Sequence, residues 1–256
     1  METPVRRIEA MGDLAGLSRR GTELFVTAAV EAIGARGRFS VAVSGGSTPR
    51  PLFQLLATEE FRTRIDWERV HFFWADERCV PPDHPDSNFK GAHDILLAKL
   101  PLPAANIHRI PGELAPPEAA RAYERELRVF FSGASMPVFD LILLGVGEDG
   151  HTASLFPGEE GIGEKERLAV ALYVEKLHTH RVTLTLPVLN SARRVVFLVA
   201  GREKAVIVQE VLEGKNPRLP AAQVNPPEGS LIWLLDSEAA GKLSGNFCSY
   251  ESTTSS

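Results

Sequence analysis

The sequence has few of the features that mark extracellular or membrane proteins. Only two of its 256 residues are cysteines, Cys79 and Cys248, and they lie far apart, so no disulfide framework is indicated. No stretch approaches the roughly 20 consecutive apolar residues of a membrane span. The N-terminal segment also lacks the apolar core of a secretory signal. The sequence therefore predicts a cytoplasmic protein that has no membrane partner.

Clustered positive charge is missing as well. The chain carries 28 Lys and Arg residues against 33 Asp and Glu residues, a net charge of −5, and it has no long basic run. We expect no nucleic-acid partner, because binding nucleic acid requires a clustered basic face. A small anionic substrate is compatible with this composition, since a few well-placed cations are enough to neutralise it locally.

Several catalytic and metal-binding motifs are absent. The sequence contains no G-x-x-x-x-G-K-[ST] phosphate loop, no G-x-S-x-G nucleophile turn, no H-E-x-x-H and no C-x-x-C. Cys79 has no adjacent His to activate it, so we expect a buried structural thiol there. His178 and His180 share one face of an expected strand, but no third ligand follows at a recognisable spacing. We therefore predict no metal site and no cofactor.

The chain does contain an alternation of apolar runs and helical patterns. Short, nearly continuous apolar runs predict strands at residues 39–44, 70–75, 106–110, 139–147, 168–174, 181–186, 193–201 and 230–236. Apolar residues at helical spacing predict helices at residues 12–34, 49–57, 86–100, 116–131 and 202–214. This pattern is typical of a single doubly wound α/β domain, with a mostly parallel central sheet flanked by helices. We expect the domain to span residues 1–244 and residues 245–256 to form a polar, disordered tail.

The loop that follows the first expected strand has features that suit an anion. In such sheets the ligand lies outside the carboxyl ends of the strands, so the loops after the strands are where a site is expected. In "SGGSTP", Gly45 and Gly46 allow close approach of the backbone, and Ser47 or Thr48 can cap the helix that follows. Backbone N–H groups at a helix start suit a phosphate. A plain strand-to-helix turn would have the same sequence.

Charged residues follow other expected strands. Asp76, Glu77 and Arg78 come directly after the second strand, where they either line the site or solvate a loop. Arg181 begins a strand and Lys204 opens a helix, and single cations of this kind are most often solvated. Together with a phosphate-binding loop, however, they are candidates to neutralise the charge of the phosphate.

The loop "GVGEDGH" raises the main question about function. Gly145, Gly147 and Gly150 fit the G-x-G-x-x-G spacing of a dinucleotide-binding loop. That fingerprint should open a long helix, whereas Pro157 interrupts any helix here, and Asp149 would repel a pyrophosphate. The glycines are better explained by a sharp turn of the chain.

Such a turn would project Asp149 and His151 into the crevice. An imidazole can take a proton from water at neutral pH, and a nearby carboxylate can orient it and stabilise its cation. The pair therefore indicates general acid–base chemistry. The alternative is a capping His in a surface loop.

Taken together, these loops resemble the 6-phosphogluconolactonase family over about residues 8–243. The segments that carry the resemblance are "SGGSTPRPLF", "WADERCVPPDHPDSNF", "FDLILLGVGEDGHTASLFPG", "RVTLTLPVLNSARRVVFLVAGREKA" and "EGSLIWLLD". The resemblance implies hydrolysis of 6-phospho-D-glucono-1,5-lactone to 6-phosphogluconate, a step of the pentose phosphate pathway. It also implies a doubly wound α/β fold, no cofactor, and a phosphosugar lactone as the small-molecule partner of a monomer or small homo-oligomer.

The resemblance and the residue chemistry agree on a mechanism. The phosphate would lie on the loop from Gly45 to Thr48, held by Arg181 and Lys204. His151 would take a proton from the attacking water, oriented by Asp149 or by Asp76. Arg78 or an amide of a glycine loop would stabilise the oxyanion, and the sequence does not choose between them.

Three rival functions differ in what they require. A glucosamine-6-phosphate deaminase continues its G-x-G-x-D-G-H loop with "IGFNEP", whose Glu helps ring opening, whereas this chain continues with "TASLFP". Glu159 and Glu160 follow a few residues later and keep that alternative open. A non-catalytic phosphosugar binder would not need both Asp149 and His151. A nucleotide-dependent oxidoreductase would need the fingerprint context that is missing.

Overall fold

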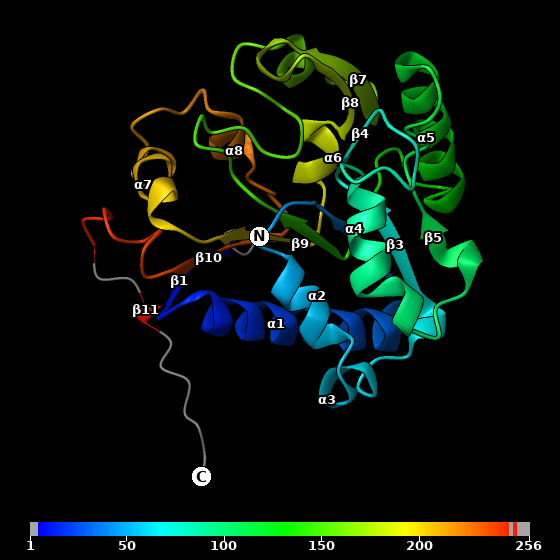
Figure 1. The fold of residues 1–256 in the computed structure, drawn as a ribbon, viewed down its shortest axis with the longest axis horizontal. Coiled ribbons are helices and arrows are strands. Elements are labelled where there is room, and N and C mark those ends of the chain that lie inside the picture. The colour runs from blue at the N-terminus through cyan, green and yellow to red at the C-terminus, as the bar shows by residue number, and fades with distance from the viewer. Residues whose placement is uncertain (1–4, 246–247, 250–256) are drawn as a thin grey trace.

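A parallel sheet forms the centre of the computed structural model, which describes residues 5–245, 248 and 249 (Figure 1). Within these residues, eight strands pair in parallel throughout. In sheet order they are β11 (Cys248–Ser249), β1 (Val5–Met11), β10 (Ser230–Asp236), β9 (Arg194–Val199), β6 (Leu141–Leu144), β2 (Phe39–Val43), β3 (Val70–Trp74) and β5 (Ile107–His108).

The central strands are buried on both faces. Every residue of β2 and β6 is buried, which explains why "FSVAV" and "LILL" are nearly continuous apolar runs. Burying each large aliphatic side chain contributes roughly 1.5–3 kcal/mol, so these strands supply much of the core's stability. The predicted doubly wound α/β fold with a mostly parallel sheet is confirmed.

Helices cover both faces of this sheet. In Figure 1, α1 (Leu14–Arg36) and α2 (Arg50–Leu56) lie on one side of β9 and β10, while α7 (Ala205–Leu212) and α8 (Pro220–Gln223) lie on the other. The remaining helices are α3 (Glu59–Arg62), α4 (Asn88–Ile95), α5 (Pro116–Phe130) and α6 (Leu186–Asn190). Among the described residues, no helix combines the length and apolar character needed to span a membrane.

The ends of α1 and α4 are set by local signals in the sequence. Asp13 caps α1 by accepting a hydrogen bond from the Gly16 backbone N at 2.8 Å, and Gly37 ends the helix with a φ of 73°. Ser87 caps α4 in the same way, because its hydroxyl accepts from the Lys90 backbone N at 3.1 Å. The helices predicted at 12–34 and 86–100 are confirmed, although α4 itself ends at Ile95.

A second, antiparallel sheet departs from the expected alternation of strands and helices. The runs predicted at 168–174 and 181–186 form β7 (Ala169–Val174) and β8 (Thr179–Leu184), which pair with each other and not with the parallel strands. The short turn between them can join only antiparallel neighbours. The third strand, β4 (Asp76–Arg78), pairs with β8 and consists of residues that the sequence predicted as a loop.

The strands at the β1 edge of the main sheet were not predicted. β1 has the sequence "VRRIEAM", and its charged residues interrupt the apolar run that would have predicted a strand. It pairs with β10 and β11. Of the predicted tail at 245–256, Cys248–Ser249 forms β11, while residues 246, 247 and 250–256 lie outside the described residues. The division into a domain and a tail stays a prediction.

Candidate active site

The strand order brings together the loops that carry the predicted site residues. β9, β6, β2 and β3 are neighbours in the parallel sheet, so the loops that follow them meet at its carboxyl edge. A pocket of about 320 Å³ lies there. Its lining includes nine of the ten predicted site residues: Gly45, Gly46, Ser47, Thr48, Asp76, Arg78, His151, Arg181 and Lys204. Of the predicted catalytic residues, Asp149 is the one that does not line the pocket.

Asp149 instead contacts the far side of the His151 ring. Its Oδ1 lies 2.5 Å from His151 Nδ1, and its Oδ2 accepts a hydrogen bond from Lys176 Nζ at 3.1 Å. The imidazole also stacks on the Phe156 ring, with centroids 4.2 Å apart. Because Nδ1 is engaged by Asp149, Nε2 is the ring nitrogen left for a ligand in the pocket.

The carboxyl of Asp149 stays ionised over most of the pH range. Partial burial alone would raise its pKa, but the hydrogen bond and charge of His151, together with the hydrogen bond from Lys176, lower the pKa to about 2. An ionised carboxylate at Nδ1 fixes the tautomer of a neutral imidazole and stabilises the imidazolium that forms when the ring takes a proton.

Two glycines make this arrangement possible. A Cβ at Gly147 would lie 2.0 Å from His151 Nδ1 and 2.8 Å from Asp149 Oδ1, so any side chain there would displace the pair. Gly150 has a φ of 82°, in the left-handed region that favours glycine. The glycines therefore shape the turn that carries the two polar residues.

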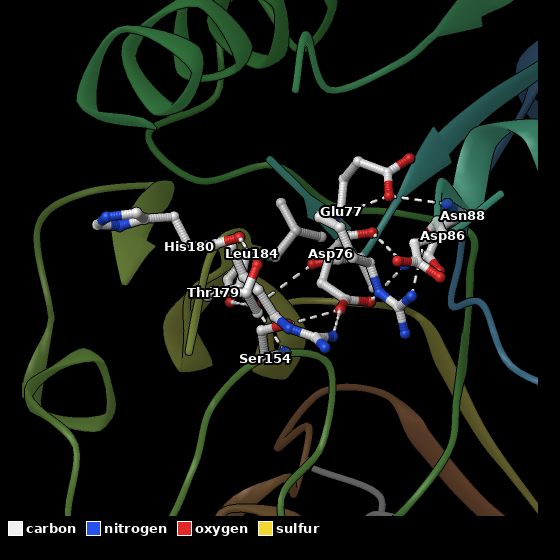
Figure 2. A network of polar contacts seen from close by, with 12 residues as sticks. Asp76, Glu77, Asp86, Asn88, Ser154, Thr179, His180 and Leu184 are labelled. Carbon is white, nitrogen blue, oxygen red and sulfur yellow. Dashed lines mark hydrogen bonds and ion pairs between the residues drawn. The ribbon is translucent and has the colours of Figure 1, made fainter. Parts of the chain in front are cut away.

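Asp76 is buried and belongs to a different set of contacts (Figure 2). Its Oδ2 accepts a hydrogen bond from Ser154 Oγ at 2.6 Å and lies 3.9 Å from a terminal nitrogen of Arg181. Asn88 Nδ2 donates to the Asp76 carbonyl at 2.9 Å. Of the two carboxylates that the sequence offered as partners of His151, Asp149 is the one that contacts the imidazole.

Arg78 and Arg181 lie directly opposite each other in the register of β4 and β8. Like charges in such positions destabilise a sheet. In the described part of the chain, the Nε of each arginine is buried and has no hydrogen-bond partner. Burial, and then the charge of Arg78, lowers the pKa of Arg181. Both observations suit an anion that would pair with the two guanidinium groups.

The expectation that Ser47 or Thr48 caps the next helix is wrong. α2 begins at Arg50 after the N-cap residue Pro49, and no side chain within the described residues caps it. The Ser47 carbonyl accepts from the Arg50 backbone N at 3.2 Å, so a turn precedes the helix. The two hydroxyls line the pocket without a capping role.

Glu77 has a structural role that the sequence did not reveal. Its carboxylate is buried and accepts hydrogen bonds from the backbone N of Asn88 and of Phe89, both at 2.8 Å, and from Ser87 Oγ at 3.0 Å. Burial raises the pKa of Glu77, and the backbone hydrogen bonds oppose that change. Glu77 thus ties β4 to the start of α4 beside the pocket.

Three further residues of the pocket were not among the predicted site residues, although Ser44 and Glu203 lie next to predicted ones in the sequence. Ser44, Asn88 and Glu203 line it from the end of β2, the start of α4 and the turn before α7. Asn88 packs so tightly on Gly45 that a Cβ there would lie 1.8 Å from Asn88 Oδ1. Asn88 lies at the start of the helix predicted at residues 86–100, and that position was the available signal for this contact.

Cys79 and the two histidines considered as metal ligands, His178 and His180, lie outside this pocket. Burial, and then the charge of Glu77, raises the pKa of Cys79 to about 11, so its thiol is protonated at neutral pH. His178 ends a turn with a φ of 48°, and His180 packs on Tyr173. Within the residues the structure describes, no three His, Cys, Asp or Glu side chains are grouped to hold a metal ion.

The fold and the pocket together define a class of protein: an α/β protein whose pocket, at the carboxyl edge of a parallel sheet, is lined by a histidine paired with an aspartate and by two facing arginines. A family model described as glucosamine-6-phosphate isomerases/6-phosphogluconolactonase matches residues 12–233. The chain belongs to this family.

Individual relatives match over most of their length. A 6-phosphogluconolactonase of Nostoc is 39% identical over 93% of this chain and 99% of its own. A human 6-phosphogluconolactonase is 44% identical over 82% of each chain. The crystal structure of a 6-phosphogluconolactonase from Thermotoga maritima superposes with a TM-score of 0.79 at 33% identity, covering 90% of this chain and 99% of that one.

Proposed function

We propose that this protein hydrolyses 6-phospho-D-glucono-1,5-lactone to 6-phosphogluconate, with His151 as the general base. The observation that carries the proposal is the pairing of His151 with Asp149 at 2.5 Å beside a pocket that Arg78 and Arg181 also line. The names of the relatives supply the substrate, and the residues of the pocket supply the chemistry.

In this mechanism His151 Nε2 takes a proton from water as the water attacks the lactone carbonyl. Asp149 stays ionised, with a pKa of about 2, and stabilises the imidazolium. The imidazolium then protonates the ring oxygen as the tetrahedral intermediate collapses, which opens the lactone. One general base contributes about 10²–10⁴-fold, and positioning of the substrate supplies the rest.

The phosphate of the substrate would be bound by the "SGGSTP" loop with Arg181 and Lys204. Arg181 offers a buried guanidinium, and Lys204 lines the pocket from the turn that opens α7. Arg78 faces the same pocket, so it either shares the phosphate or stabilises the oxyanion in place of a glycine-loop amide. No step in this scheme requires a metal or an organic cofactor.

The deciding experiment is a turnover assay on 6-phosphogluconolactone generated in situ, measured against its spontaneous hydrolysis. The wild-type protein should accelerate ring opening, and His151→Ala should lose at least about 100-fold in kcat, the contribution of a general base. His180→Ala is the matched control, because His180 is exposed and lies outside the pocket. If His151→Ala kept more than a tenth of the wild-type kcat, the assignment of the base would fail.

A parallel assay with glucosamine-6-phosphate separates the function from its rival. Release of ammonia there, without acceleration of lactone hydrolysis, would show that the family was identified correctly but that the reaction is a deamination.

A further inference from the structure

Ser154 connects the two halves of the pocket. It lies three residues after His151 in the loop that follows β6, and it is fully buried. Its hydroxyl donates to Asp76 Oδ2 at 2.6 Å, and its backbone N donates to Thr183 Oγ1 at 3.2 Å. Thr183 is the register partner of Asp76 in the β4–β8 pair. Ser154 therefore joins the loop of the base to the sheet that carries the arginines.

The backbone around Ser154 is held in an uncommon conformation. Thr152 and Leu155 form a bridge with two backbone hydrogen bonds, of 2.9 and 3.3 Å, and Ala153 between them has a φ of 48°. A non-glycine residue in the left-handed region costs free energy and persists where its surroundings determine it. Here the turn presents the Ser154 hydroxyl to Asp76.

Asp76 is close enough to Arg181 to compete with a bound phosphate for the guanidinium group. The carboxylate Oδ2 forms a long ion pair with Arg181: it lies 3.9 Å from the nearest terminal nitrogen, beyond hydrogen-bond distance, and both side chains are mostly buried. The Ser154 hydroxyl fills the hydrogen-bonding position on that same oxygen. Without it, a buried carboxylate oxygen would lack a donor, and the closest cation that could satisfy it is the Arg181 guanidinium.

We propose that Ser154 is a positioning residue: by donating to Asp76 Oδ2, its hydroxyl keeps the Arg181 guanidinium free for the phosphate of the substrate. The inference rests on the proposed function for the identity of the substrate, but the anion-binding part of it does not require turnover. Its two elements are the Ser154–Asp76 hydrogen bond and the gap between Asp76 and Arg181.

Ser154→Ala tests this role through binding and kinetics together. Removing the hydroxyl should let Asp76 pair directly with Arg181, so the affinity for inorganic phosphate, measured by calorimetry, should fall about tenfold. The KM for the lactone should rise by a similar factor, while kcat should stay within about threefold because the His151–Asp149 contact is untouched. A fall in kcat with phosphate affinity unchanged would overturn the proposal.

A double-mutant cycle separates positioning from general damage to the loop. If Ser154 acts through Arg181, adding Ser154→Ala to Arg181→Ala should change phosphate affinity less than about twofold. An equal loss of affinity in both backgrounds would contradict the proposal. Because inorganic phosphate is the probe, this result stands even if the protein fails to hydrolyse the lactone, in which case the proposed function alone would fall.

Ser18→Ala is the matched control for the loss of a buried hydroxyl. Ser18 is equally buried and donates to the Leu14 carbonyl at 2.6 Å, but it lies in α1, outside the pocket. Its replacement should leave phosphate affinity unchanged. Should Ser154→Ala not fold, Asp76→Asn tests the same chain of contacts. Removing the charge that competes for Arg181 should tighten phosphate binding, and unchanged binding would overturn the proposal.

Discussion

The two walls of the pocket differ in how their charges are matched. On the wall formed by the loop after β6, Asp149 pairs with both His151 and Lys176. On the wall formed by β4 and β8, Arg78 and Arg181 face each other, and the Nε of each lacks a partner within the described residues. The charged groups of the first wall are paired within the protein, whereas the arginines of the second would be paired by the anion proposed above.

This difference is consistent with the roles proposed for the two walls. A group that moves protons must already be oriented when the substrate arrives, because reorganisation during the reaction would raise the barrier. A group that binds an anion gains from being incompletely paired, since the ligand then supplies the missing interactions. Mutations on the two walls should therefore have different kinetic signatures.

The largest effect is expected on the wall that carries His151, the proposed base, and Asp149. Asp149→Asn should lower kcat on the order of 100-fold, because an amide cannot stabilise the imidazolium and disturbs the tautomer of His151. The KM should stay within about threefold. Steady-state kinetics checks both values, with Lys176→Met as a control expected to have a small effect. A rise in KM without a change in kcat would contradict the prediction that the two walls affect different kinetic constants.

A smaller effect, of the opposite kind, is expected on the arginine wall. Arg181→Met keeps much of the side-chain volume but removes the charge, so the KM should rise about 30-fold, the cost of one charge-assisted phosphate contact. The kcat should change less than about threefold. Arg202→Met is the control, because Arg202 is exposed and pairs with Glu238 at the surface. Equal losses in kcat and in kcat/KM would mean that Arg181 acts on the transition state instead.

The smallest effect concerns stability against acid. The folded protein lowers the pKa of Asp149 to about 2, below its unfolded value, so ionised Asp149 stabilises the fold above about pH 4. That contribution is lost as the pH falls towards 2. After allowance for solvent screening it is about 1 kcal/mol. The difference in unfolding free energy between wild type and Asp149→Asn should thus shrink as the pH falls from about 4 towards 2.

Chemical denaturation across this pH series measures that difference. A difference that begins to shrink near neutral pH would mean that Asp149 is not held ionised by its partners.

Much of the fold and of the pocket could be predicted because the relevant signals are local. Apolar runs marked the central strands, and the rule that ligands lie at the carboxyl ends of parallel strands was enough to bring "SGGSTP", "GEDGH" and "GREK" to one place. The proximity of Asp149 to His151 was also predictable, since two residues separated by one glycine share a single turn, although Asp76 remained an alternative partner.

The rest depended on contacts between distant segments. β4 is three charged residues that become a strand only because β8, far along the chain, pairs with them. The position of Asp76 follows from that pairing, so the sequence could not choose between Asp76 and Asp149 as the partner of His151. The same holds for Ser154, whose hydrogen-bond partner lies on β4.

The facing arginines have a consequence for the lifetime of the protein. A ligand that binds the folded state and relieves their repulsion adds its binding free energy to the stability of the fold, by an amount that grows with its concentration. The molecule should therefore resist heat and proteolysis best when phosphosugar is abundant. Its persistence would then follow the supply of the compound it consumes.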